Sequence, residues 1–291
     1  SGAADIGQGA ETVISQIVAE ELGVLLEDVR ITAADTGLTP LDPGTFGSGV
    51  TVRAGNAAKL AAVEAKSKLF QFVAEKLEAN PEDLVARNRE IFVKGSPETM
   101  MTMKDAIKGY QYADLPMPIV GRGSWMAPAD EPTTLFKQNG NFSPNYSFMT
   151  QAAEVEVDLT TGQVKLLRMV TAHDCGRPIN PMLVEGQLEG SVVGGMGQAL
   201  YEDVIVEKGQ VMNPSFLDYG FPTFLEMPEI EAIEVETVDP IGPFGAKEAG
   251  EGTQLSPAPA IVNAIYDAIG VDFMELPITP EKILKALEEK K

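Results

Sequence analysis

Cysteine, histidine and tryptophan are almost absent from this chain. Its 291 residues include one cysteine, Cys175, one histidine, His173, and one tryptophan. A single cysteine excludes an internal disulfide framework, and it excludes a zinc or iron–sulfur site whose cysteine ligands come from this chain alone. A single histidine likewise excludes a metal site with several histidine ligands. Any redox group that the chain uses must therefore be supplied from outside its own side chains.

Basic residues and long apolar runs are also scarce. Lys and Arg total 22 against 43 for Asp and Glu, which gives a net charge of −21. Such a surface repels a phosphate backbone, so nucleic acid is not an expected partner. No run of about 18 apolar residues is present, and residues 1–10 have neither a basic nor an apolar leader segment. We expect a soluble, cytoplasmic protein without a membrane partner.

The composition is that of a globular protein large enough for two subdomains. Hydrophobic residues make up 44% and charged residues 22% of the chain, which is ordinary for a folded domain. Residues 126–147 lack periodicity and contain Pro, Asn and Gly, so they are the best candidate for a connection. We therefore predict one subdomain over residues 1–140 and a second over 141–291.

Hydrophobic periodicity predicts a mixture of helices and strands in the first half. The buried face of the longest helix is expected to carry Leu60, Val63, Phe70, Val73 and Leu77. The expected elements are the end of a strand before a glycine turn at 1–9, a helix at 10–22 stopped by Gly23, a strand at 27–36, a long helix at 56–79, a short helix after Asn80, a strand at 89–95 and a helix at 102–110.

The second half opens with the clearest strand pair. Residues 150–174 alternate in polarity on both sides of a turn near Thr161 and Gly162, which predicts a hairpin. The later elements expected are a helix at about 182–200, a strand at 230–238, a helix from Pro257 to Gly270 and a last helix beginning at Pro280. Because the strands and helices are intermixed and the clearest pair is a hairpin, the predicted class is α+β.

Glycine-rich segments occur at four places. They read DIGQGAE at 5–11, GTFGSGVT at 44–51, EGSVVGGMGQ at 189–198 and GAKEAGEGT at 245–253. Each segment by itself is typical of a turn. Glycine before a helix also exposes backbone N–H groups at the positive end of the helix dipole, which suits an anionic ligand. Neither an ATP-binding loop nor a dinucleotide fingerprint is present to explain them.

Glu251 is the sharpest single candidate, because Gly250 and Gly252 leave it unshielded by a bulky neighbour. Such a carboxylate can act as a general base. Local sequence alone favours the other interpretation, an acid at a helix entry that faces solvent. For Lys247 and Glu248 we expect a loop ion pair or solvated charges.

His173, Asp174 and Cys175 are consecutive and chemically attractive. In an extended strand, neighbouring side chains point to opposite faces, so all three cannot converge on one substrate atom. We therefore expect packing and turn formation at these residues rather than catalysis. Gln8, between two glycines, is a neutral donor and acceptor that suits hydrogen bonds to a pterin or a phosphate.

The four glycine segments, in this order, resemble the molybdenum-cofactor subunit of the xanthine dehydrogenase, aldehyde oxidase and carbon monoxide dehydrogenase family. DIGQG resembles that family's pterin contact, GTFGSGVT its G-T-x-G-S-R-S-T loop, and AKEAGEG its A-K-G-x-G-E turn. CGRPINP and GQLEGSVVGGMGQALYE are similar to two further motifs, D-x-G-x-x-I-N-P and G-Q-x-x-G-G-x-x-Q-G-x-G-x-A-L-x-E. The match covers nearly the whole chain.

The resemblance implies a fold of two related α/β subdomains of the xanthine oxidase type. It implies that Glu251 is the general base in hydroxylation of an electron-poor carbon of a small aldehyde or N-heteroaromatic substrate, with oxygen from water. The cofactor would be molybdopterin, as a cytosine dinucleotide, whose dithiolene holds molybdenum without protein ligands. The cofactor-binding residues implied are Gly7, Gln8, Gly9, Ala10, Gly47, Ser48, Gly49, Val50, Thr51, Lys247 and Gly250.

Only the C-terminal molybdenum region of that family is matched, as in a fragment or a split subunit of the nicotinate dehydrogenase or hydroxybenzoyl-CoA reductase type. The implied partners are an upstream molybdopterin-binding half, an iron–sulfur subunit and an FAD subunit. Gly49 stands where many relatives have Arg, and Gly194 where many have Gln. The alternative is a cofactor-binding or assembly module that is inactive without its partner half. A plain hydrolase is disfavoured because G-x-S-x-G is missing.

Overall fold

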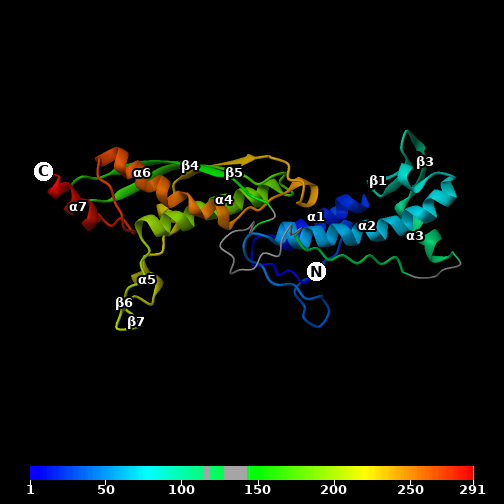
Figure 1. Ribbon diagram of the computed structural model, residues 1–291, viewed down its shortest axis with the longest axis horizontal. Coiled ribbons are helices and arrows are strands. Elements are labelled where there is room, and N and C mark those ends of the chain that lie inside the picture. Colours follow the sequence, from blue (N-terminus) through cyan, green and yellow to red (C-terminus); the bar gives the residue numbers. More distant parts are fainter. Residues whose placement is uncertain (114–117, 128–142, 144, 291) are drawn as a thin grey trace. The chain divides into compact units, whose positions relative to one another are not determined.

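The computed structural model describes residues 1–113, 118–127, 143 and 145–290. The chain divides into two compact units, coloured by sequence in Figure 1. The first unit contains Ser1–Tyr146 and Val238–Lys247, and the second contains Ser147–Thr237 and Glu248–Lys291. The chain therefore returns to the first unit for one short segment. The predicted boundary between residues 140 and 141 lies outside the described residues.

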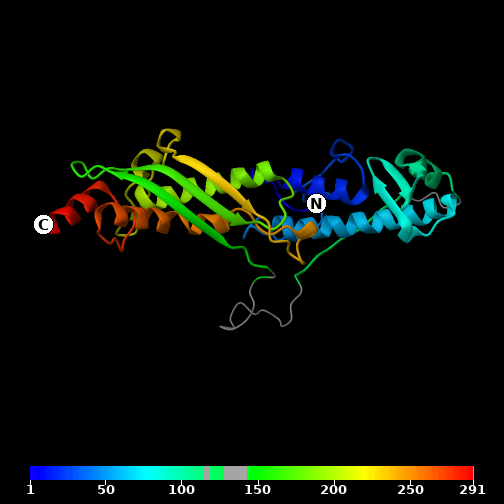
Figure 2. The ribbon, with the colours of Figure 1, turned by 90° about the horizontal axis from the view of Figure 1, so that it is seen from above.

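Two helices that lie side by side form the centre of the first unit, as Figures 1 and 2 show. They are α1 (Ala10–Leu22) and α2 (Val50–Leu77). Their first turns share one buried cluster, in which Ala10 of α1 packs with Val50 and Ala54 of α2. A Cβ added to Gly55 would lie 2.8 Å from Cδ1 of Ile17, so a small residue is needed where the helices approach. The two N-termini consequently lie at the same end of the pair.

The predicted helix 10–22 is confirmed, whereas the second helix differs from the prediction. Gly23 ends α1 in the left-handed conformation, as glycine typically does after a helix. α2 begins six residues earlier than the expected residue 56, because Val50 and Val52 bury their side chains in the first turn. Leu60 and Val63 were expected to be buried, but 45% and 40% of their surface is exposed. The predicted buried face is correct only farther along the helix.

A small antiparallel sheet covers the far part of α2. Its strands are β1 (Leu84–Arg87), β2 (Glu90–Val93) and β3 (Ser96–Thr102), in that order. The helix α3 (Met103–Gln111) follows, and a buried cluster joins these elements to Phe70 and Val73 of α2. Two single turns of 3-10 helix follow the long helices: η1 (Leu26–Asp28) comes after α1, and η2 (Pro81–Asp83) lies between α2 and β1. The predicted strand at 89–95 and helix at 102–110 are confirmed.

The two strands predicted at 1–9 and 27–36 are wrong. Residues 1–9 contain no strand, and 27–36 contain the end of η1 followed by irregular chain. The two segments do touch, since the Ser1 ammonium donates to the carbonyl of Thr32 at 3.0 Å and the N–H of Ala34 donates to the carbonyl of Ser1 at 3.2 Å. Two bonds without a further neighbouring strand are too few to make a ladder.

The second unit is built on a three-stranded sheet. Its strands are β4 (Met149–Val157), β5 (Val164–Asp174) and β8 (Glu229–Val235), in that order. β4 and β5 form the predicted antiparallel hairpin, while β8 pairs with β5 in parallel. The helix α4 (Pro181–Leu200) lies on the connection between those parallel strands. Hairpin, parallel pair and helices together confirm the predicted α+β class.

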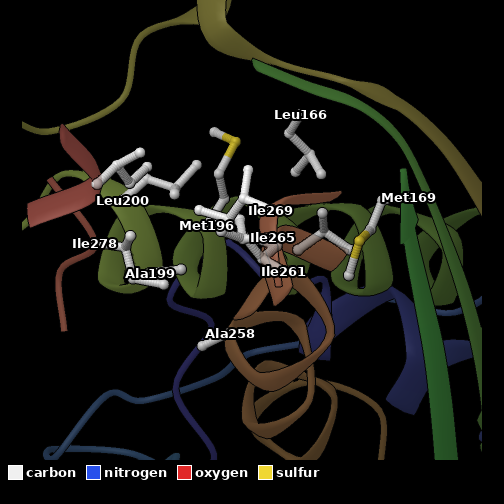
Figure 3. Close-up of a cluster of buried hydrophobic side chains, with 12 residues drawn as sticks. Leu166, Met169, Met196, Ala199, Leu200, Ala258, Ile261, Ile265, Ile269 and Ile278 are labelled. Carbon is white, nitrogen blue, oxygen red and sulfur yellow. The ribbon is translucent and has the colours of Figure 1, made fainter. Parts of the chain in front are cut away.

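Helices α4 and α6 (Pro257–Ile269) cover one face of this sheet (Figures 1 and 2). Figure 3 shows the side chains between them, where Met169 of β5, Met196 of α4 and Ile265 of α6 are fully buried. A last helix, α7 (Pro280–Glu289), adds Ile283 to the same cluster. The predicted helices at 182–200, from Pro257 and from Pro280 are confirmed, each with proline in its first turn.

The chain between α4 and β8 forms a projection from the second unit, as Figure 1 shows. It holds a two-stranded ribbon of β6 (Val206–Glu207) and β7 (Gln210–Val211), then α5 (Phe216–Tyr219) and η3 (Phe224–Glu226). We call its exposed apolar residues the 204–225 surface; each has at least 47% of its surface exposed, and they are Val204, Ile205, Val206, Val211, Met212, Phe216, Leu217, Phe221, Phe224 and Leu225. Within the described ranges, no helix is long and apolar enough to cross a membrane.

Candidate functional site

The loop before α1 is organised by the Asp5 carboxylate. Its Oδ1 accepts hydrogen bonds from the N–H groups of Gly7 at 2.9 Å and Gly9 at 3.4 Å, and its Oδ2 accepts one from Glu11 at 3.2 Å. The N–H of Gly7 is the largest of the causes that hold the pKa of Asp5 below its ordinary value of 3.8, and burial opposes them. Asp5 thus caps the positive end of α1 from outside the helix.

Gln8 lies in the same loop and is engaged with it. Its Oε1 accepts from the N–H of Ile6 at 2.7 Å, and its Nε2 donates to the carbonyl of Ala4 at 3.4 Å. The side chain is half-buried. In this conformation the Gln8 amide, which was predicted to hydrogen-bond a pterin or a phosphate, is hydrogen-bonded to its own loop.

The loop before α2 is organised by Arg53. Its Nη2 donates to the carbonyl oxygens of Gly44 at 3.2 Å and Phe46 at 2.8 Å, and its guanidinium carbon lies 4.6 Å from the centre of the Phe46 ring. Thr45 joins this loop to the first one, because its hydroxyl donates to the carbonyl of Ala4 at 2.6 Å. The structure therefore brings together the predicted residues at 7–10 and 47–51.

Within this pair of loops, the predicted residues differ in what they can contact. Ala10 and Val50 are buried between the helices, so they pack rather than face a ligand. Gly7 and Gly47 have φ angles of 106° and 57°, which favour glycine, and a Cβ at either position would meet no atom within 4 Å. Their backbone is open to a ligand on the side where a side chain would otherwise stand.

The returning segment packs across α2. The Nδ2 of Asn56 donates to the carbonyl of Ile241 at 2.9 Å, and the ammonium of Lys59 lies 4.1 Å from the centre of the Phe244 ring. The segment contains η4 (Pro243–Gly245) and ends at Lys247. Lys247 is only 7% exposed, so the expectation of a solvated charge there is wrong.

Glu251 begins η5 (Glu251–Leu255), a short 3-10 helix in the second unit, and Gly250 precedes it. Its side chain is exposed, while Thr253, two residues later, is fully buried. The turn is therefore anchored on one side and open on the other. Both interpretations of Glu251, a general base and an acid that faces solvent, are compatible with this exposure.

Side chains from two strands bind carbonyl groups on both sides of Glu251. His173 of β5 lies with Nε2 2.9 Å from the carbonyl oxygen of Glu248. A carbonyl only accepts, so this bond assigns the ring proton to Nε2. Gln151 of β4 donates from Nε2 to the carbonyl of Thr253 at 3.0 Å. The bonds join residues 75 and 102 positions apart in the chain.

Two hydroxyl groups surround the carbonyl of Gly250. The Oγ of Ser191, on α4, lies 2.9 Å from that oxygen, and the Oγ1 of Thr253 lies 2.6 Å from it. The two hydroxyl oxygens are 2.6 Å apart, and Ser191 also lies 2.7 Å from the carbonyl of Gln187. Each hydroxyl has one proton, so the two protons are shared among these acceptors. The carbonyl of Gly250 is therefore joined to α4 either directly by the Ser191 hydroxyl or through the Thr253 hydroxyl.

The Glu248 side chain is 21% exposed, so it is not a fully solvated charge, and its carboxylate lies beside His173. Oε1 of Glu248 is 3.5 Å from Nε2 of His173. A Cβ added to Gly252 would lie 2.3 Å from the same Oε1, so a side chain at 252 would displace Glu248. Among the described residues, Oε2 of Glu248, Nδ1 of His173 and Oε1 of Gln151 are buried atoms without a hydrogen-bond partner.

Asp174 and Cys175 make contacts of the kind expected of them, namely turn formation and packing. Oδ1 of Asp174 accepts from the N–H groups of Gly176 at 3.1 Å and Thr237 at 3.2 Å, which fixes the end of the strand. The Cys175 thiol is buried, and burial, followed by the charge of Glu234, raises its pKa to about 11. A thiol with so high a pKa is a poor nucleophile near neutral pH.

Gly49 and Gly194 differ from the motifs that this chain resembles. At each of them, a neighbouring side chain occupies the space that a side chain of its own would need. A Cβ at Gly49 would lie 2.9 Å from the guanidinium carbon of Arg53. A Cβ at Gly194 would lie 2.8 Å from Nε2 of Gln254. A guanidinium and an amide thus lie next to the two positions at which the resemblance led us to expect Arg and Gln.

Several organising residues were not identified from the sequence. Asp5 and Arg53 fall within or beside the glycine segments, so their charge was a usable signal. Ser191 lies within the glycine segment at 189–198 and Gln151 in a predicted strand, but neither is charged, and they contact the Glu251 turn only through the fold. Among the described residues, no three His, Cys, Asp or Glu side chains form a group that could hold a metal ion.

Comparisons with known proteins agree on one family. A family model described as "Molybdopterin cofactor-binding domain" matches residues 1–228. The gamma subunit of the 6-hydroxypseudooxynicotine dehydrogenase complex of Paenarthrobacter nicotinovorans is 37% identical over 287 residues, which is 97% of this chain and 35% of that protein. The xanthine dehydrogenase molybdenum-binding subunit of Escherichia coli O157:H7 is 34% identical over 97% of this chain and 36% of its own length.

A solved structure is similar over the same extent. Quinoline 2-oxidoreductase from Pseudomonas putida 86 matches 99% of this chain and 36% of its own chain, with a TM-score of 0.87 and 30% identity. The chain thus spans about a third of the length of the relatives that it matches.

Proposed function

Since the chain belongs to the molybdopterin cofactor-binding domain family, we propose that it forms the C-terminal part of the catalytic molybdenum subunit of a hydroxylase. Its substrate would be a small aldehyde or N-heteroaromatic compound, hydroxylated at an electron-poor carbon with oxygen from water. The similarity to quinoline 2-oxidoreductase and to a subunit of a 6-hydroxypseudooxynicotine dehydrogenase complex supports a substrate of this class. We expect the complex to be cytoplasmic.

The observation that carries the proposal is the pair of glycine loops at the N-termini of α1 and α2. Gly7 and Gly47 leave the backbone open where a side chain would stand. Asp5 already caps the positive end of α1, so the positive end of α2 is the one that favours an anionic group. These residues fit the pterin and its phosphate-bearing tail, which we expect to be a cytosine dinucleotide. Residues 7–9, 47–49, Thr51, Lys247 and Gly250 would hold this cofactor, while Ala10 and Val50, which were also predicted to bind it, would support the loops from behind by packing.

Glu251 is the residue of this chain that we assign to the chemistry. Its carboxylate is exposed at the start of η5, on a turn whose backbone is bound from behind. As a general base it would take a proton from the group that is to attack the substrate carbon. When bound, the molybdenum cofactor supplies two-electron redox chemistry.

Electrons would leave through iron–sulfur clusters and FAD on partner subunits. The single cysteine of this chain supports that assignment, because an iron–sulfur cluster requires several thiolates. The remaining part of the molybdenum-binding subunit would be a further partner, since the chain spans only about a third of its relatives.

We propose that this remaining part covers the 204–225 surface. Ten large apolar residues are exposed there within a short stretch of the chain, and a concentration of exposed apolar residues is typical of interaction sites. The relatives align over 97% of this chain and contain about twice as much chain again outside the match. That length supports an occupant from the same subunit rather than a second copy of this chain.

The Glu251→Gln variant tests the assignment of the base. In the molybdenum-containing complex we expect at least about a 100-fold loss of kcat, within the usual contribution of a general base, with molybdenum and pterin content unchanged. Glu275→Gln, another exposed glutamate of the second unit, is the matched control and should keep full activity. Full activity of the Glu251→Gln complex would refute the role.

A cofactor-binding or assembly module is the second candidate, and the match to a family described as a molybdopterin cofactor-binding domain supports the binding part of it. Stoichiometric molybdopterin binding by residues 1–291 without turnover of any aldehyde or N-heteroaromatic compound, alone or with its partners, would establish it. Turnover that appears only when the partner half is added would instead support the catalytic subunit.

A further inference from the structure

The turn that carries Glu251 has three of its backbone carbonyl oxygens bound by side chains. They are the carbonyls of residues 248, 250 and 253, which lie before and after Glu251. The side chains come from β5, α4 and β4, so three separate elements converge on one short turn. We call Gln151, His173, Ser191 and Thr253 the carbonyl clamp.

His173, Ser191 and Thr253 of the clamp are buried and Gln151 is half-buried, in contrast to the exposed Glu251. His173 and Thr253 are 0% exposed and Ser191 is 8% exposed. Hydrogen bonds in such a low-dielectric setting are stronger than in water. They also tie the turn to the core of the second unit, because Met169 on β5 and Met196 on α4 are fully buried in that core. The turn is thus rigid behind Glu251 and open in front of it.

Neither composition nor packing requires such a set of bonds. A surface turn of glycines and small residues can satisfy its carbonyls with water. Buried polar side chains such as His173, Ser191 and Thr253, in contrast, have to be fully hydrogen-bonded or they destabilise the core. Nδ1 of His173 and Oε1 of Gln151 are buried without a hydrogen-bond partner, so the hydrogen bonding of these side chains is incomplete even here. A costly arrangement that persists around one exposed carboxylate indicates a function for the direction of that carboxylate.

We propose that the carbonyl clamp is a set of positioning residues that fixes the direction in which the Glu251 side chain leaves the backbone. This inference rests on the proposed role of Glu251 as general base. Three of the clamp residues are buried and Gln151 is half-buried with its amide bound to the turn, so they would act on the reaction only through Glu251. Displacement of a catalytic group by about 1 Å can lower a rate about 100-fold, which sets the scale of the expected effect.

Thr253 offers the sharpest test, because valine has the same shape but lacks the hydroxyl. In the molybdenum-containing complex, Thr253→Val should lower kcat by about 10-fold or more while KM changes by less than about 2-fold. Molybdenum and pterin content should stay at the wild-type level. Hydrogen exchange of the backbone amides at 250–252 should become faster. Thr253→Ser, which restores the hydroxyl, should restore both kcat and protection.

A matched pair of serine variants tests the same clamp from α4, including the case in which Thr253→Val fails to assemble. Ser191 and Ser15 are both buried helix residues whose hydroxyl lies 2.7 Å from the carbonyl four residues earlier. Only Ser191 also reaches the carbonyl of Gly250. Ser191→Ala should therefore lower kcat and speed exchange at 250–252, whereas Ser15→Ala should do neither.

The exchange data separate failure of the inference from failure of the proposed function. Faster exchange at 250–252 in the Thr253→Val or Ser191→Ala complex with unchanged kcat would overturn the positioning role. Unchanged exchange in both variants would also overturn it, because the clamp would not hold the turn. If Glu251→Gln keeps full activity, the proposed function fails, and the positioning role fails with it even where exchange shows that the clamp holds the turn.

Discussion

Asp5 accepts a hydrogen bond from the N–H of Gly7 at 2.9 Å, so a carboxylate of this chain occupies an N–H group that was predicted to bind the cofactor. The same carboxylate also binds Gly9 and Glu11. An anionic group that approached these donors would meet Asp5 first. The open side of Gly7, rather than its N–H, is therefore the available contact in this conformation.

Replacing Asp5 should produce a pH-dependent loss of stability. Its pKa in the folded protein is below 3.8, so its ionised form stabilises the fold above that pH, and the contribution is lost as the pH falls below 3.8 through the folded value. Asp5→Asn should cost about 1 kcal/mol at pH 7, as loss of a helix cap does. Urea unfolding at several pH values measures this difference.

The control for that variant is Asp35→Asn. Asp35 also accepts from a nearby glycine N–H, that of Gly37 at 2.8 Å, but it lies in a loop rather than before a helix. Its variant should change stability less than Asp5→Asn does. A cost for Asp5→Asn that is as large at pH 2 as at pH 7 would show that the charge of Asp5 is irrelevant.

Cys175 should react slowly with alkylating reagents. Burial raises its pKa to about 11 from an ordinary 9.0, so the thiolate fraction at pH 8 is about 100-fold lower than for an unperturbed thiol. Iodoacetamide labelling of the native protein, followed by mass spectrometry, should show little modification until urea unfolds the chain. Rapid labelling of the native protein at pH 8 would contradict the buried position.

The 204–225 surface should matter for assembly and not for folding. Phe224 and Leu225 are each 89% exposed, so replacing both with serine removes few contacts within this chain. The loss of two large apolar anchors should weaken binding of the remaining part of the subunit by at least about 10-fold. Size-exclusion chromatography with light scattering would measure how much of the complex forms, and thermal unfolding of the chain should be unchanged.

Met274→Ser provides the matched control, because Met274 is also 89% exposed but lies outside that surface. Its variant should assemble normally. If the Phe224 and Leu225 substitutions leave assembly intact but abolish a dimer of this chain, the surface is instead an interface between copies.

The elements that the sequence predicted best are those whose signals are local. Helices α4 and α7 begin with a cap and a proline in adjacent positions, and the cap side chains Asn180 and Thr279 accept N–H bonds within three residues. The hairpin of β4 and β5 likewise closes within one turn. Such signals need no knowledge of the rest of the fold.

The elements that failed depend on distant neighbours. The segments at 1–9 and 27–36 have strand-like patterns but make only two bonds with each other. The parallel pairing of β5 with β8 and the contacts of Gln151 with Thr253 join residues far apart in sequence. The glycine segments pointed to the loops at 7–10 and 47–51 and to the Glu251 turn, whereas the residues that organise these turns came only from the structure.

The brief return of residues 238–247 to the first unit means that the backbone passes between the two units three times. Neither unit is therefore a continuous stretch of chain, and no single cleavage can release one of them intact. Truncation before 238 would also deprive Asn56 of its carbonyl partner on Ile241. Engineering that aims to study either unit alone would have to rejoin its separate pieces with a new linker.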